Sequence, residues 1–194
     1  MTSAERPAVT PAEQPAGFVL RRLGGTEAAH RADRLAAVYG QAQGSRAEPL
    51  AHFAENVRTC VREYAGATVL AALSGGTDGE IVGFLHGCDL QLQHWWPQQI
   101  EGALRAKGRE TWLQDAFELI ELDVLPQVQG RGIGTALLTR QLADMPHRRV
   151  VLSAEPEGRA RELYRRLGFV DLVPDFAYDG TDYRAALMGW DRQR

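Results

Sequence analysis

Short apolar runs separated by polar, glycine-rich or proline-rich segments predict a series of β-strands along the chain. These runs cover residues 18–22, 68–73, 81–86, 117–124 and 149–154, a segment that begins at 169–170, and residues 185–190. The second and third runs are separated by Ser-Gly-Gly-Thr-Asp-Gly, which is typical of a turn. We therefore expect these two strands to form a hairpin.

Helical spacing of apolar residues predicts helices between the strands. The first begins at Thr26, a suitable N-cap, and the second covers about residues 46–64. Another follows a glycine-rich segment and covers about residues 132–143. The apolar face of the next helix consists of Ala160, Leu163, Tyr164 and Leu167. Gly168 stands where a glycine at the C′ position would end that helix.

The stretch 91–115 interrupts this series of strands. It contains Trp95, Trp96 and Trp112, and a polar helix is expected after Pro97. Strands that are first antiparallel and then joined by helical connections predict a mixed α/β fold.

Length and composition are those of an ordinary globular protein. The chain has 194 residues, of which 44% are hydrophobic and 24% are charged. We expect a single domain over residues 18–194, preceded by a disordered leader over residues 1–17. The leader lacks the apolar core of a signal peptide, and no apolar run approaches the ~18 residues of a membrane span.

Cysteines and histidines show no spacing that is typical of a metal or redox site. Cys60 and Cys88 lie in apolar contexts, and the five histidines are scattered. From these spacings we predict no metal site and a reducing, cytoplasmic location.

The charge of the chain is unevenly distributed. The net charge is −3, but residues 129–169 contain eight arginines and only four acidic residues. Most of these arginines are expected to lie on solvated helix faces. Their position beside a glycine-rich loop favours a small polyanionic ligand over DNA.

The segment 118–134 carries the strongest functional signal. An apolar strand leads through Pro126 into a loop with glycines at 130, 132 and 134, and the loop opens onto a helix. Unpaired backbone N–H groups and the positive end of a helix therefore meet there, which predicts a phosphate site. The dinucleotide fingerprint would require glycine where Thr135 stands, and a Walker loop would require a lysine, but Lys107 is the only lysine.

Two motifs resemble those of a known family. Gln129, Gly132 and Gly134, preceded by Val124 and Pro126, resemble motif A of the GCN5-related N-acetyltransferases, the GNAT superfamily. Residues 160–169 resemble the motif B helix of that family and lie at the right distance from motif A. The resemblance implies the GNAT acyl-CoA N-acyltransferase fold. In that fold a central, mostly antiparallel sheet is splayed at the motif A strand and has helices on both faces.

The resemblance also implies acetyl-CoA as the acyl donor, with its pyrophosphate held by N–H groups of the loop. The coenzyme contacts carried over from the family fall on Leu122, Val124, Gln129, Gly130, Arg131, Gly132, Ile133, Gly134 and Thr135. The family often has an asparagine where this chain has Pro156, so either another group holds the pantetheine arm at that point or the arm is held less firmly.

The implied reaction is direct attack of a primary amine on the thioester in a ternary complex. An alkyl ammonium with a pKa near ~10 must first lose a proton, and the departing thiolate must gain one. Tyr164 matches the motif B tyrosine and is the candidate acid, although a core tyrosine is the alternative. Glu118 and Glu121 are the two candidates for the base and are expected on opposite faces of one strand.

The predicted function is therefore acetyl-CoA-dependent N-acetylation of a primary amine on a small molecule or peptide. Stretch 91–115 is expected to line the acceptor pocket, unless its tryptophans belong to the core. One alternative is a GNAT-fold protein that binds acyl-CoA without turnover, and another is a toxin that acetylates aminoacyl-tRNA. No DNA or membrane partner is expected, and a homodimer is left open.

Overall fold

The computed structural model describes residues 15–193, so most of the predicted leader lies outside the described residues. The strands are β1 (Phe18–Leu23), β2 (Thr68–Ser74), β3 (Glu80–Asp89), β4 (Ala116–Val124), β5 (Arg149–Ala154), β6 (Val170–Ala177) and β7 (Arg184–Asp191). The α-helices are α1 (Gly25–His30), α2 (Ala32–Gln43), α3 (Leu50–Glu63), α4 (Trp95–Ala106), α5 (Ile133–Asp144) and α6 (Arg159–Arg166). Short 3₁₀ helices are η1 (Gly44–Arg46), η2 (Glu110–Leu113) and η3 (Pro126–Val128). None of the described helices is long and apolar enough to cross a membrane.

The strands form one open sheet in the order β1-β2-β3-β4-β5-β7-β6. β1 pairs with β2, β5 with β7 and β6 with β7 in antiparallel fashion, whereas β4 and β5 are parallel. The β4–β5 pairing is short: it covers Ala116–Glu118 against Arg149–Val151, although β4 continues to Val124. The mixed, mostly antiparallel sheet that splays at the motif A strand is therefore confirmed.

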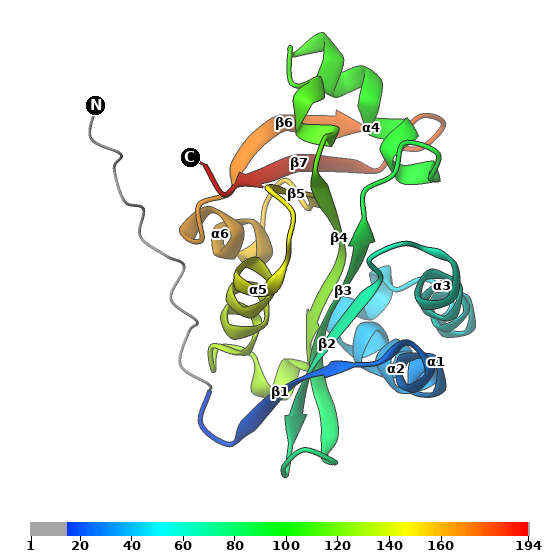
Figure 1. The fold of residues 1–194 in the computed structure, drawn as a ribbon, viewed down its shortest axis with the longest axis vertical. Coiled ribbons are helices and arrows are strands. Elements are labelled where there is room, and N and C mark those ends of the chain that lie inside the picture. The colour runs from blue at the N-terminus through cyan, green and yellow to red at the C-terminus, as the bar shows by residue number, and fades with distance from the viewer. Residues whose placement is uncertain (1–14, 194) are drawn as a thin grey trace. The chain divides into compact units, whose positions relative to one another are not determined.

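The chain divides into two compact units, and each has its own buried side chains. Unit 1 contains the described residues up to Arg58 together with Val69–Leu85 and Leu122–Met145. Within it, α1 and α2 lie on one face of the β1–β2 strands and α5 lies on the other (Figure 1). The single domain predicted over residues 18–194 stays a prediction.

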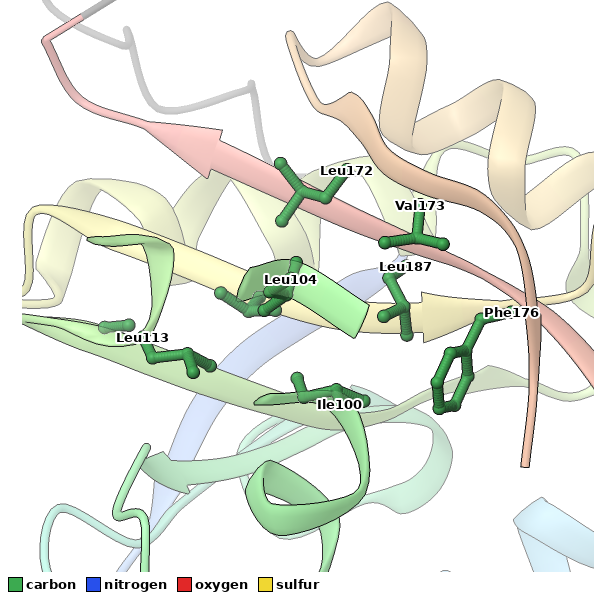
Figure 2. Close-up of a cluster of buried hydrophobic side chains, with 9 residues drawn as sticks. Ile100, Leu104, Leu113, Leu172, Val173, Phe176 and Leu187 are labelled. Carbon is green, nitrogen blue, oxygen red and sulfur yellow. The ribbon is translucent and has the colours of Figure 1, made fainter. Parts of the chain in front are cut away.

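Unit 2 contains Thr59–Thr68, His86–Glu121 and Pro146–Arg194, of which residue 194 is not described. Its core forms where α4 and η2 pack against the last strands. Figure 2 shows these side chains, which include Ile100, Leu104, Leu113, Leu172, Val173, Phe176 and Leu187.

The tryptophans of stretch 91–115 divide between the core and the surface. Trp96 and Trp112 pack against the core of unit 2, and a Cβ at Gly189 would lie 2.6 Å from the Trp112 ring. Trp95 is exposed and stacks on Tyr178 at 6.2 Å between ring centroids. Of these three tryptophans, therefore, only Trp95 is exposed enough to line an acceptor pocket.

Prolines account for two departures from the predicted elements and lie at one irregularity of the sheet. α3 begins at Leu50 rather than near residue 46, because the residue before Pro49 is disfavoured in helical geometry. α4 begins at Trp95, before Pro97, since a proline in the first turn has no N–H that the helix needs. Pro174 lies in β6, an edge strand whose pairing with β7 is irregular on either side of Val173.

The single helix predicted from Thr26 is instead two helices. Arg31 separates α1 from α2 with φ −90° and ψ 6°, and its guanidinium contacts Glu27 at 3.1 Å. α1 buries only Ala28, whereas α2 carries the apolar stripe that the sequence indicated.

Candidate active site

In unit 1 two hydrogen bonds hold the turn after β4, one to β3 and one to Gln129 at the start of the glycine-rich loop. The Leu125 N–H donates to the Val82 carbonyl at 2.8 Å. The Gln129 side-chain amide donates to the Val124 carbonyl at 3.0 Å. Gln129 therefore spans the turn and sets the course of the backbone before the glycines.

The glycines give the loop a conformation that other residues rarely adopt. Gly130 has φ 76° and Gly132 has φ 81°, and nothing lies within 4 Å of a Cβ built at either position. The requirement for glycine here is therefore conformational rather than steric.

The N-terminus of α5 is arranged to bind an anion. Gly132 is its N-cap and provides no side-chain cap, and the Ala136 N–H makes the first intrahelical bond, to the Gly132 carbonyl at 2.9 Å. The N–H groups of Ile133, Gly134 and Thr135 precede that bond, so they have no acceptor within the helix. Their alignment with the positive end of the helix suits this N-terminus to an anion such as a phosphate group.

Arg131 is placed beside the same loop but is not directed freely into solvent. Its guanidinium lies over the Phe18 ring, 4.7 Å from the ring centroid, in a cation–π contact. Leu122 and Val124, the other predicted coenzyme contacts, are half-buried at the end of β4, beyond the point where pairing with β5 stops.

Many of the arginines between residues 129 and 169 bind carboxylates. Arg140 pairs with Asp144 at 2.6 Å. In unit 2, Asp171 binds two of them and Asp191 binds two more; these arginines are Arg161, Arg165, Arg148 and Arg149. Most of the basic region therefore serves local ion pairs. Arg149 and Arg161, whose side chains are only 12% and 13% exposed, do not lie on the solvated helix faces that were expected.

Glu118 is a buried carboxyl group in unit 2. It lies on β4 with only 8% of its surface exposed, and its Oε2 makes no hydrogen bond within the described part of the chain. Burial raises the pKa of Glu118 to about 7, and the neighbouring Cys60 adds to this rise. A carboxyl with such a pKa can accept a proton near neutral pH.

The surroundings of Glu118 could not be found from spacing along the sequence. Cys60 comes from α3, Cys88 from β3, and His94 from the residue before α4. The two thiols hydrogen-bond with each other. This bond lowers the pKa of Cys60, whereas the bond and burial together raise the pKa of Cys88, so Cys60 is the more acidic thiol.

Tyr164 is buried on α6 of unit 2. The helix ends as predicted: Gly168 has φ 90°, the Gly168 N–H donates to the Arg165 carbonyl, and the Phe169 N–H donates to the Tyr164 carbonyl. The Tyr164 and Phe169 rings lie 5.4 Å apart, which is the apolar contact that accompanies this type of helix end. The role of Tyr164 as an acid stays a prediction.

Two other predicted positions have less distinctive environments. Glu121 is half-buried on β4. Pro156 offers its carbonyl to the Arg161 guanidinium, which occupies that group.

The open sheet, the splayed strand and the glycine-led N-terminus of α5 together define a mixed α/β protein with a helix end suited to an anion. The model of the acetyltransferase (GNAT) domain family matches residues 65–171, more than half of the chain. The chain belongs to the GNAT family.

Individual relatives agree with this assignment. The chain is 33% identical over 136 residues to the GCN5-like protein acetyltransferase Rv2170 of Mycobacterium tuberculosis, and the match covers 66% of each protein. A GNAT-family protein from Desulfovibrio desulfuricans superposes with a TM-score of 0.62 at 16% identity, over 90% of this chain and 99% of that one. YncA of Salmonella typhimurium, solved with its cofactor acetyl-CoA, superposes with a TM-score of 0.59 at 15% identity. The match covers 92% of this chain and 96% of that one. At these identities the solved structures establish the fold, and the family makes acetyl-CoA the cosubstrate expected here.

Proposed function

We propose that this protein is an acetyl-CoA-dependent N-acetyltransferase that acts on a primary amine of a peptide or protein. The observation that carries the proposal is the uncapped, glycine-led N-terminus of α5 in a chain of the GNAT family. The choice of a protein amine rests on the relative Rv2170, whose name describes a protein acetyltransferase.

The proposed roles follow from the chemistry of each group. The N–H groups that begin α5 bind the pyrophosphate of acetyl-CoA, and the β4 backbone beyond Glu118 is available for the pantetheine amides. Glu118 takes a proton from the acceptor ammonium, with Glu121 as the alternative base. The amine nitrogen then bonds to the acetyl carbon, the C–S bond breaks, and the Tyr164 hydroxyl gives its proton to the departing sulfur. The second proton lost by the nitrogen as the amide forms then restores the Tyr164 hydroxyl.

The test of catalysis compares two variants with the unchanged protein. Glu118→Gln and Tyr164→Phe should each lower kcat by about 10²–10⁴-fold, the usual contribution of a general acid or base. Acetyl-CoA affinity, measured by calorimetry, should stay unchanged. Thiol release with a lysine-containing peptide reports turnover, and Glu55→Gln, at an exposed position on α3, is the matched acid-to-amide control.

Different outcomes separate the candidate functions. Acetyl-CoA binding without thiol release for any amine would favour the acyl-CoA sensor. Full activity in both variants would refute the assigned roles, and full activity in Glu118→Gln alone would transfer the base role to Glu121.

The proposed phosphate site is tested by introducing a negative charge at the N-terminus of α5. Thr135→Glu puts a carboxylate in the first turn of α5, where it favours the helix but repels an anion. Acetyl-CoA affinity should fall at least about tenfold, because like charges at a binding site cost several kcal/mol. In the control Thr135→Gln, the new side chain has the size of glutamate but no charge. This variant should bind acetyl-CoA more tightly than Thr135→Glu. Equal affinities would place the coenzyme elsewhere.

A further inference from the structure

Three metal-ligand side chains from separate parts of the sequence converge in unit 2. They are Cys88 on β3, His94 before α4 and Glu118 on β4, and their ligand atoms all lie within 4.8 Å of one another. Cys88 and Glu118 are buried, and His94 is half-buried. Spacing along the chain does not indicate this group, because the three positions form no recognisable ligand pattern.

Two atoms of the cluster are buried without a hydrogen-bond partner. Within residues 15–193, neither Oε2 of Glu118 nor Nδ1 of His94 makes a hydrogen bond. Glu118 is more than nine-tenths buried, so its unsatisfied oxygen is costly unless a ligand completes it. Both atoms are of types that bind transition metals.

The cluster is also held in position by its neighbours. The His94 ring stacks on Tyr64 with 3.9 Å between centroids and 20° between planes. Cys60 hydrogen-bonds to Cys88 and is the nearest further sulfur donor. His86, which is also buried close by, has its Nδ1 3.3 Å from the Thr68 carbonyl, so that nitrogen is engaged.

We propose that Cys88, His94 and Glu118 form a binding site for a thiophilic divalent cation, with Zn²⁺ as the best match. Zinc accepts sulfur, nitrogen and carboxylate oxygen together, whereas Ca²⁺ and Mg²⁺ take oxygen ligands. A Cys88 thiolate and the Glu118 carboxylate would balance the two positive charges. Zinc bonds of about 2.0–2.3 Å require the ligand atoms to close by up to about 1 Å. Water then supplies the fourth ligand.

Occupation of this site has a consequence that rests on the proposed function. A cation bound to Glu118 prevents that carboxylate from accepting the acceptor's proton. Zn²⁺ would therefore inhibit acetyl transfer, and a chelator would restore it. Metal binding itself does not depend on whether Glu118 is the base.

The test is titration of the full chain, with its thiols reduced, by Co²⁺ alone. We expect a thiolate-to-cobalt charge-transfer band that saturates at one equivalent and is abolished by competing Zn²⁺. His94→Phe keeps a ring against Tyr64 but removes the nitrogen donor. It should weaken Co²⁺ binding at least about 100-fold, since even groups behind the ligands change metal affinity by 10–100-fold. Cys88→Ala should remove the charge-transfer band.

Controls make the test decisive. His52 is an exposed histidine outside the cluster, so His52→Phe should bind Co²⁺ like the unchanged protein. Absence of the band, its persistence in Cys88→Ala, or equal affinities of His94→Phe and His52→Phe would overturn the proposal. Acetyl transfer is measured separately on the chelator-treated, metal-free protein. Cobalt binding together with no acetyl transfer by the metal-free protein would uphold the metal site while refuting the proposed function. Acetyl transfer by a protein that binds no cobalt would uphold the proposed function while refuting the metal site.

Discussion

Replacement of Asp191 by asparagine should destabilise the protein through loss of one buried carboxylate. Asp191 lies on β7 and accepts hydrogen bonds from the Arg148 Nε at 3.0 Å, the Arg149 Nε at 3.3 Å and the Gln193 N–H at 2.8 Å. Only 8% of the Asp191 side chain is exposed. Asparagine keeps the shape but has no charge to offer the two guanidinium groups.

The magnitude follows from the burial of the two partners. Removal of one member of a buried ion pair costs about 3–5 kcal/mol, because the other charge is left uncompensated. Arg148 is 37% exposed and can turn to water, so the expected loss is smaller. We expect a loss of about 2–4 kcal/mol in the free energy of unfolding, which for a chain of this size lowers the melting temperature by about 4–16 °C.

The loss should depend on pH. Burial by itself would raise the pKa of Asp191, but hydrogen bonds from Arg148 and Gln193 and the nearby arginine charges bring the pKa below its usual value. A carboxylate with a lowered pKa in the folded state contributes stability above its unfolded pKa of about 3.9. This contribution disappears as the pH falls through the folded pKa. The difference between Asp191→Asn and the unchanged protein should therefore shrink in strong acid.

Urea unfolding near neutral pH and in acid measures both effects. Asp175→Asn is the matched control, since Asp175 pairs with Arg184 on the surface and their side chains are 63% and 53% exposed. An exposed pair of this kind contributes up to about 1 kcal/mol. Equal losses for the two variants, or a loss for Asp191→Asn that does not change with pH, would refute the reasoning from burial.

Two further pairs of substitutions test packing in unit 2 by urea unfolding, one pair at glycines and one at leucines. Gly87→Ala should lower the free energy of unfolding by about 1–3 kcal/mol, because the new Cβ would lie 2.3 Å from the Glu118 carbonyl oxygen. Gly102→Ala on α4 meets nothing within 4 Å and should instead stabilise by about 0.4–1 kcal/mol; a loss in both would point to a general intolerance of change. Leu104→Ala, fully buried in the core, should cost about 2–5 kcal/mol. The exposed Leu92→Ala should change stability by less than about 0.5 kcal/mol, so similar effects at both leucines would contradict the assigned core.

Features that depend on neighbouring residues could be predicted from the sequence. The end of α6 is one example, since Gly168 and Phe169 form the local pattern that stops a helix. The glycine loop is another, because positive φ at Gly130 and Gly132 is a property of those residues themselves. The phosphate site follows from them once the helix after the loop is recognised.

Features that depend on residues far apart in the sequence could not be predicted. The burial of Glu118 and the rise in its pKa arise from elements that lie far from it in sequence, and nothing in the strand pattern indicates them. The same holds for the pairing of Cys60 with Cys88. The division of the tryptophans is decided by the core that α4 forms with the last strands, and not by their local sequence.

Glu118 joins the proposed function to the proposed metal site. A carboxyl group that is buried with one oxygen unsatisfied reduces stability, so its presence calls for a function that needs those conditions. A base that must accept a proton near neutral pH needs a pKa above that of an ordinary carboxyl group, and burial raises the pKa of Glu118 to about 7. The same burial brings Cys88 and His94 within reach of that carboxylate, which gives a thiophilic cation access to the base. Catalysis and metal inhibition would then be two results of a single buried charge, and the cobalt titration and the thiol-release assay measure them independently.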